Sequence, residues 1–293
     1  MRQLRLAQLG RRALALSGVT LAVLVLAGVF GGGALGQSRQ ETLIIARNID
    51  DYVTNDPHRQ YEYTAQMLDQ SSYDTLVTVE APDFTKIQPK LATKWEVSKD
   101  GTVYTFTLRS GVKFSSGNPL TAADVKFSLM RLKHLKDNPA FFMDPVKDIE
   151  VVNDTTVRVT LGAPDASFLA ALAAVPTAIA EAKAVMAHGG TDAEDAKEKD
   201  KATEWLNEHS AGSGPYILTS FKKNEEAVLE RNPNHWGPKG HFAKIVFRHV
   251  KDGTTQREMV ERGDVDIAHD FDPDIVAKVR PGPKIKIVEG LSM

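Results

Sequence analysis

The fold prediction rests first on LATKWEVSKDGTVYTFTLRSGVKFSSGNPLTAADVKFSLMR, Leu91 to Arg131. Its first half contains a run at 104–108 in which apolar residues alternate with threonines, and this period predicts a strand with one face on a core. A strong turn signal, Asp100-Gly101, separates this run from the apolar and charged residues 95–97. The first half of the stretch therefore predicts a β-hairpin.

A helix is predicted directly after the hairpin. Thr121 and Asp124 have a spacing like that of a capping box, in which each side chain satisfies a backbone group of the first helical turn. Apolar residues then recur at the helical period and form one face: Ala122, Val125, Leu129 and Leu132. The whole stretch consists of packing and turn residues, and no nucleophile or general base in it has an evident partner.

Strands and helices alternate on both sides of this stretch, which predicts an α/β fold. Strand-like segments occur at 42–47, 76–79, 157–161, 216–221, 227–230, 244–250 and 265–268. Helices are predicted over 61–79, ending near the strand-like 76–79, over 168–175, and from a second capping box, Thr255 and Glu258, to Gly263. The highly charged segment 188–209 is predicted to be a solvated helix or loop on the surface.

The N-terminus is typical of an export signal. Four arginines precede an apolar run at 13–30, and small residues follow at Ala34 and Gly36. We predict a signal peptide over 1–36, cleaved after Gly36, and a soluble periplasmic product. The alternative is an uncleaved anchor, because the apolar run nearly reaches the length of a bilayer span. A lipoprotein signal would need a cysteine, and the chain has none.

Composition and motifs exclude several classes of function. The 36 basic and 38 acidic residues give a net charge of −2, which argues against nucleic-acid binding. The absence of cysteine excludes disulfides, thiolate catalysis and thiolate-ligated zinc. Two S-x-x-K pairs begin at Ser110 and Ser220, but the partner motifs of a serine hydrolase are missing.

Two further segments resemble ligand sites only superficially. The run Gly212-Ser213-Gly214-Pro215 lacks the phosphate-loop pattern and predicts a turn that needs glycine. The acidic stretch 264–274 does not fit an EF-hand, because His269 occupies the sixth position, where glycine is required. We therefore predict no catalytic residues, no cofactor and no metal site.

Several blocks in order resemble bacterial family 5 solute-binding proteins, the extracytoplasmic receptors of peptide and nickel ABC importers. The first is the stretch from Leu91 to Arg131, and the second is GSGPYILTSFKKNEEAVLERNPNHWG, residues 212–237. Residues 242–248 and REMVERGDVDIA, 257–268, resemble the blocks that follow. The resemblance implies a type II periplasmic-binding-protein-like fold of two lobes with an extra domain II, and it implies a receptor rather than an enzyme.

The resemblance also implies a division into domains. Domain I is expected over 38–58 and 177–268, domain II over 59–176, and the start of domain III over 269–293. Members of the family are considerably longer, so we expect either a fragment of a longer protein or a C-terminally truncated gene product. Such a chain lacks most of the second lobe, and we expect it to bind peptides poorly or not at all.

The loop after the first strand is expected to face the ligand cleft. This nominates Asp50, Asp51, Tyr52 and Asn55 as substrate-binding residues, with Asp51 suited to a peptide amine. A structural alternative is that Asp50 or Asp51 caps the turn before Pro57. The expected partners are a small peptide or similar solute and the membrane permease subunits, with the receptor itself a monomer. The alternatives are a chaperone-like or sensory binding protein on the same scaffold and a secreted hydrolase.

Overall fold

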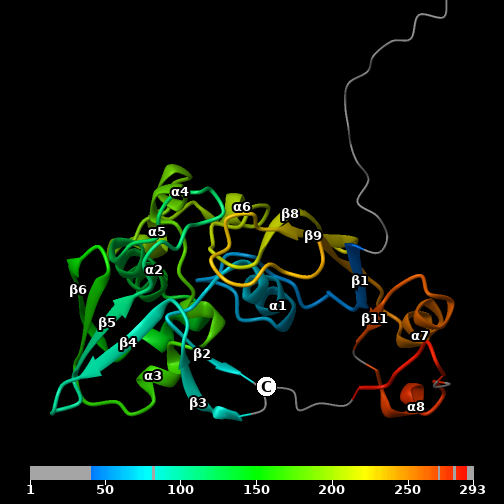
Figure 1. Ribbon diagram of the computed structural model, residues 1–293. Coiled ribbons are helices and arrows are strands. Elements are labelled where there is room, and N and C mark those ends of the chain that lie inside the picture. The colour runs from blue at the N-terminus through cyan, green and yellow to red at the C-terminus, as the bar shows by residue number, and fades with distance from the viewer. Residues whose placement is uncertain (1–40, 81–82, 270, 280–281, 289–293) are drawn as a thin grey trace, which may run out of the picture. The chain divides into compact units, whose positions relative to one another are not determined.

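Two larger β-sheets and one two-stranded sheet organise this computed structural model (Figure 1). The structure describes residues 41–80, 83–269, 271–279 and 282–288, all of which belong to the unit that runs from residue 37 to residue 293. The predicted signal peptide, residues 1–36, lies outside the described residues. The predicted α/β class is confirmed.

The first sheet has five strands in the order β11-β1-β10-β9-β8. These strands are β11 (Ile267–Ala268), β1 (Thr42–Arg47), β10 (Lys244–His249), β9 (Glu226–Arg231) and β8 (Tyr216–Lys222). β1 runs parallel to both of its neighbours, while β9 is antiparallel to β10 and to β8. The strands predicted from the sequence in these regions are confirmed, with shifts of one or two residues at their ends.

The second sheet has four antiparallel strands in the order β4-β5-β7-β6. These are β4 (Ala92–Val97), β5 (Val103–Leu108), β7 (Thr156–Leu161) and β6 (Val146–Asn153). The predicted hairpin is confirmed as β4 and β5, and Gly101 in its turn has a φ of 71°, which favours glycine. The apolar residues of β5 are buried as predicted: Tyr104, Phe106 and Leu108.

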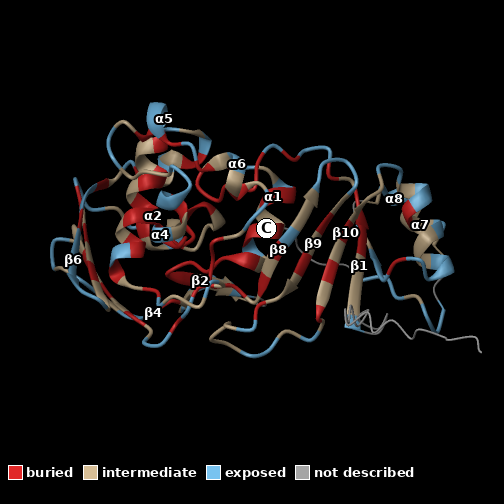
Figure 2. Ribbon diagram, turned by 90° about the horizontal axis from the view of Figure 1, so that it is seen from above, coloured by how far each residue is buried: buried red, intermediate tan, exposed pale blue. Residues whose placement is uncertain are grey.

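Helix α2 (Ala122–Leu135) packs on β6 and β7 and is largely buried (Figure 2). Its start is held by Asp124, whose carboxylate accepts hydrogen bonds from the amide and the hydroxyl of Thr121, both at 2.9 Å. The second oxygen of Asp124 accepts the amide of Ala182 at 3.0 Å. The predicted cap therefore also joins α2 to the later helix α4 (Ala182–Ala187).

Helix α1 (Tyr63–Ser72) packs on β8, and its Leu68 belongs to the core of the five-stranded sheet. The two-stranded sheet follows, with β2 (Val77–Glu80) and β3 (Asp83–Pro89). The helix predicted over 61–79 is thus a shorter helix and a strand.

The helix predicted over 168–175 is too long. It divides into α3 (Phe168–Ala171) and the 3₁₀ turn η3 (Val175–Thr177). Pro176 lies inside this turn, and a proline disfavours helical backbone in the residue before it. Another 3₁₀ turn, η2 (Asn138–Met143), connects α2 to β6.

The glycines of the run 212–215 allow its backbone to lie close to the backbone of Ser72. A Cβ atom on Gly212 would lie 2.1 Å from the carbonyl oxygen of Ser72, and one on Gly214 would lie 2.5 Å from the carbonyl carbon of Ser72. The amide of Gly214 donates to that carbonyl at 3.0 Å. The run therefore lies directly against the end of α1.

Helix α7 (Gly253–Arg262) begins earlier than predicted. Its N-cap is Asp252, whose carboxylate accepts the amide of Thr255 at 2.7 Å and the hydroxyl of Thr255 at 2.8 Å. Thr255 and Glu258 therefore do not form the cap that their spacing predicted. Gly263 ends the helix with a φ of 79°, as predicted, and the short helix α8 (Pro273–Val276) follows β11.

The predicted domain boundaries remain a prediction. The five-stranded sheet draws on 42–47 and 216–268, both assigned to domain I, and the four-stranded sheet lies within 59–176. Helix α1 was assigned to domain II, yet it packs on β8 of the other sheet.

Candidate functional site

The carboxyl ends of three neighbouring parallel strands meet at one edge of the five-stranded sheet. Arg47 at the end of β1 is in register with His249 at the end of β10, and Ala46 is in register with Ala268 in β11. We call the residues that follow these ends, 47–52, 249–251 and 268–269, the carboxyl edge. In open α/β sheets, ligands bind in the crevice outside such ends.

Hydrogen bonds to backbone groups hold the strand ends of this edge together. Gln256 of α7 is 1% exposed, and its side chain donates to the carbonyl of Val250 at 2.7 Å and accepts the amide of His269 at 3.2 Å. One amide side chain thus joins the ends of β10 and β11. The carbonyl of Arg47 accepts the amide of Val250 at 2.9 Å, which joins β1 to the same point.

Asp50 is exposed and forms an ion pair across the edge. Its carboxylate lies 2.9 Å from the ammonium of Lys251 and 3.5 Å from Nε2 of His249. Nδ1 of His249 accepts the amide of Ile49 at 3.2 Å, an arrangement that leaves Nε2 to carry the ring proton toward Asp50. The hydrogen bond from Lys251 lowers the pKa of Asp50, so this carboxylate stays ionised.

Asp51 is also exposed, but its carboxylate serves the start of α1. It accepts the amide of Thr64 at 3.0 Å and the hydroxyl of Thr64 at 2.5 Å. Glu62, the residue at the N-cap position, supplies no capping hydrogen bond from its side chain. Asp51 is therefore a cap, as the structural alternative proposed, although it caps α1 and not the turn before Pro57.

Tyr52 and Asn55 are buried in contacts within the chain. The ring of Tyr52 lies 4.0 Å from that of Phe221, and its hydroxyl donates to Oδ1 of Asn207 at 3.4 Å. Burial raises the pKa of Tyr52. The amide and the side chain of Asn55 both donate to Asn207 at 2.9 Å. Of the four nominated residues, only Asp50 and Asp51 face solvent, and their role in binding remains a prediction.

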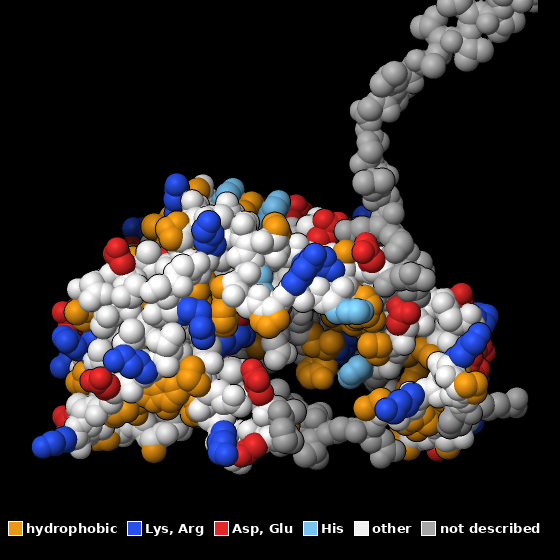
Figure 3. Space-filling model, in the orientation of Figure 1, with side chains coloured by type: hydrophobic (Ala, Val, Ile, Leu, Met, Phe, Trp, Pro, Cys, Tyr) orange, Lys and Arg blue, Asp and Glu red, His pale blue; other side chains and the backbone are white. Residues whose placement is uncertain are grey.

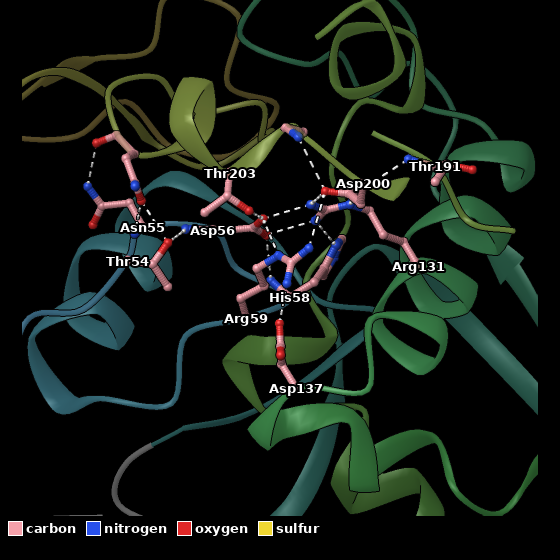
Figure 4. A network of polar contacts seen from close by, with 12 residues as sticks. Thr54, Asn55, Asp56, His58, Arg59, Arg131, Asp137, Thr191, Asp200 and Thr203 are labelled. Atoms are coloured by element: carbon pink, nitrogen blue, oxygen red, sulfur yellow. Dashed lines mark hydrogen bonds and ion pairs between the residues drawn. The ribbon is translucent and has the colours of Figure 1, made fainter. Parts of the chain in front are cut away.

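A buried ion network holds the loop that follows the carboxyl edge (Figure 4). Arg131 of α2 is fully buried and makes bidentate hydrogen bonds to two carboxylates. Its guanidinium nitrogens donate to both carboxylate oxygens of Asp56 at 2.7 Å and to both carboxylate oxygens of Asp200 at 2.8 Å. Nδ1 of His58 lies 3.0 Å from the guanidinium, and Nε2 of His58 lies 3.0 Å from the carbonyl oxygen of Ala178.

The charge states of this network follow from burial and from Arg131. Burial alone would raise the pKa of Asp56, but the attraction and hydrogen bonds of Arg131 outweigh it and lower the pKa to about 2. Burial and then the nearby Arg131 lower the pKa of His58 to about 4. His58 is therefore neutral, with Nδ1 accepting from Arg131 and Nε2 donating to Ala178.

The sequence did not reveal this network because Asp200 lies in the charged segment 188–209. That segment forms α5 (Ala196–Lys199) and α6 (Thr203–Leu206), and it contributes buried residues to the core: Ala196, Asp200, Ala202 and Leu206. The prediction of a solvated surface segment is therefore wrong for these residues. The apolar residues at 196, 202 and 206 among the charges were the available sign that this segment contributes to the core.

Two aspartates of the acidic stretch 264–274 make structural contacts. Asp266 accepts the amide of Ile44 at 2.8 Å, and Asp264 pairs with Arg262 at 2.9 Å. Within 41–80, 83–269, 271–279 and 282–288, no group of three or more acidic or histidine side chains could hold a metal ion. None of the helices in this part of the chain is long and apolar enough to cross a membrane.

Comparison with known proteins confirms the predicted family. Residues 86–293 match the family described as bacterial extracellular solute-binding proteins, family 5 Middle. The probable D,D-dipeptide-binding periplasmic protein DdpA of Escherichia coli K12 is 30% identical over 253 residues, which cover 85% of this chain and 47% of the relative. The nickel-binding periplasmic protein of the same organism is 32% identical over 219 residues, which cover 73% of this chain and 39% of the relative.

A solved structure of a periplasmic binding protein is similar to this chain in fold and in sequence. The periplasmic binding protein DppA from Helicobacter pylori, in complex with the peptide STSA, is 28% identical, with a TM-score of 0.69 over 81% of this chain and 48% of that one. The chain thus spans about half the length, or less, of the curated relatives it matches. By its matched residues and its fold, this chain belongs to the bacterial extracellular solute-binding proteins of family 5.

Proposed function

We propose that this chain is part of the periplasmic solute-binding component of an ABC importer for peptides or a related solute. The observation that carries the proposal is the carboxyl edge, where three parallel strands present charged side chains at one place. Figure 3 shows that this face of the molecule is hollowed between the positions of α1 and α7, with histidine, basic and hydrophobic side chains around the hollow.

The chemistry of this edge suits a polar solute. The exposed carboxylate of Asp50 and the ammonium of Lys251, which is 75% exposed at its side chain, offer an acceptor and a donor only 2.9 Å apart. A zwitterionic peptide carries one group for each of them. Relatives are named as binding proteins for dipeptides, glutathione, nickel and heme, which supports a binding role without fixing the solute.

The receptor is proposed to act as a monomer that delivers its solute to permease subunits in the membrane. Closure of two lobes around the ligand is a common mechanism for binding proteins of this kind. The residues of the carboxyl edge would form part of one wall, and the buried network of Arg131 would keep the adjoining loop in place during closure.

Two other functions are less well supported. A chaperone-like or sensory protein could use the same scaffold, since a fold does not specify a function. For a secreted hydrolase, the S-x-x-K pair at Ser110 is a poor candidate, because Ser110 is exposed in a turn and Lys113 is exposed in an isolated β-bridge to Pro119. We propose no enzymatic activity.

Uptake of labelled peptides by cells with and without the gene tests the proposal. We expect deletion to reduce uptake of a di- or tripeptide and the wild-type gene to restore it. Unchanged uptake would favour the non-transport role, and accumulation of free amino acids in the medium would favour the hydrolase.

A further inference from the structure

Two exposed aromatic rings meet where η2 lies beside the residues before α1, and a third exposed ring follows two residues later in the chain. Tyr61, Tyr63 and Phe141 are 46%, 47% and 48% exposed, and we call them the aromatic wall. Large aromatic rings are normally buried, so three rings exposed to this extent in neighbouring positions indicate a surface that contacts another molecule.

The wall is held in place by packing and by an ion pair. The rings of Tyr61 and Phe141 meet edge to face at 5.8 Å, and Phe141 stacks on Phe142 at 4.3 Å. Phe142 is partly buried and packs against the core of the four-stranded sheet. Arg59 pairs with Asp137, the residue directly before η2, and so fixes η2 beside the loop that leads to α1.

The wall is continuous with the carboxyl edge. The guanidinium of Arg47, at the end of β1, lies 4.9 Å from the centre of the Tyr63 ring. Asp51 of the edge holds the neighbouring Thr64 through two hydrogen bonds. Tyr61 and Tyr63 are two residues apart, which limits their Cα separation to about 7 Å. Tyr63 is therefore the ring of the wall that adjoins the edge.

We propose that the aromatic wall binds an aromatic or large aliphatic side chain of the solute, beside the carboxyl edge that holds its polar groups. The solute class is thus a short peptide or similar zwitterion that carries at least one large apolar side chain. This inference rests on the proposed function. Tyr61 and Phe141, which already pack on one another, offer a rigid surface that costs little conformational entropy on binding.

Ligand-observed NMR with two dipeptides tests the inference, because the method detects weak binding. The probes are alanyl-phenylalanine and alanyl-alanine, titrated against the full chain. We expect alanyl-phenylalanine to bind roughly fivefold to tenfold more tightly, and Phe141→Ala to remove most of that difference while leaving alanyl-alanine unchanged. Phe84→Ala is the matched control, because Phe84 is a 37% exposed aromatic residue on β3.

Several results would overturn the inference. Equal affinity for both dipeptides, or an equal loss in Phe84→Ala and Phe141→Ala, would show that the wall does not select the side chain, while the proposed function would survive. Sedimentation that shows a dimer in the wild type and a monomer in Phe141→Ala would assign the wall to a second copy of the chain. Absence of binding by either dipeptide would overturn the inference for this chain, while the uptake assay tests the proposed function separately.

Discussion

Replacing Arg131 with methionine is expected to destabilise the fold by about 3–5 kcal/mol at pH 7. The guanidinium is fully buried and donates four short hydrogen bonds to two carboxylates, so its removal leaves Asp56 and Asp200 facing each other without their main counterion. Methionine keeps the length of the side chain and limits the cavity, so the cost comes mainly from unpaired charge.

The wild type and Arg131→Met should also differ in how their unfolding free energies change with pH. In the wild type the pKa of Asp56 is lowered to about 2 from 3.8, so its contribution is present above pH 3.8 and is lost as pH falls through 2. A depression of that size corresponds to about 2 kcal/mol. Without Arg131 the burial of Asp56 would raise its pKa instead, so we expect Arg131→Met to gain stability relative to the wild type between pH 7 and pH 4.

Urea unfolding followed by circular dichroism measures both effects. Arg158→Met is the matched control, because Arg158 pairs with Glu150 at 2.7 Å on the surface, where a loss of about 0–1 kcal/mol is expected. Adding Asp56→Asn and Asp200→Asn to Arg131→Met should recover part of the lost stability. A loss below about 1 kcal/mol in Arg131→Met, or no recovery in the triple variant, would refute the assignment of the cost to unpaired buried charge.

Three other changes test separate contacts. Asp69 is 3% exposed and burial raises its pKa, so the folded state retains a proton that the unfolded state releases above pH 3.8, and the fold loses stability as the pH rises. Asp69→Asn should therefore reduce the slope of the unfolding free energy against pH between pH 4 and 8, and an unchanged slope would contradict this. Gly212→Ala should cost at least about 2 kcal/mol in thermal unfolding because its Cβ would collide with Ser72, and a neutral result would refute the close approach. Asp252→Ala should cost about 1 kcal/mol and speed amide exchange in α7, whereas unchanged exchange at Thr255 would argue against the cap.

Local sequence was sufficient for the elements whose signals lie within a few residues. The hairpin turn at Gly101, the strand at 104–108 and the cap at Thr121 were predicted because alternation, turn chemistry and capping act over short distances. The start of α7 was misplaced because two capping patterns overlap, and only the geometry shows that Asp252 reaches the amide of Thr255.

Long-range contacts could not be predicted in the same way. Asp200 looks like any other charge in 188–209 until Arg131 is placed beside it, 69 residues away in the sequence. The four nominated site residues illustrate the same limit, because only the structure shows that Asn207 buries Tyr52 and Asn55 while Asp50 stays exposed. A buried polar group is recognised by its partner, and a single sequence does not give the pairing.

Mapping amide chemical shifts during titration with alanyl-phenylalanine tests whether the carboxyl edge binds solute. If this chain binds solute at the carboxyl edge, saturable shifts should appear in residues 48–52 and 249–251 and stay absent from the hairpin turn at 98–102. Asp50→Asn should weaken binding without changing the unfolding free energy by more than about 0.5 kcal/mol. Shifts concentrated elsewhere, with none in residues 48–52 or 249–251 at saturating peptide, would contradict the claim.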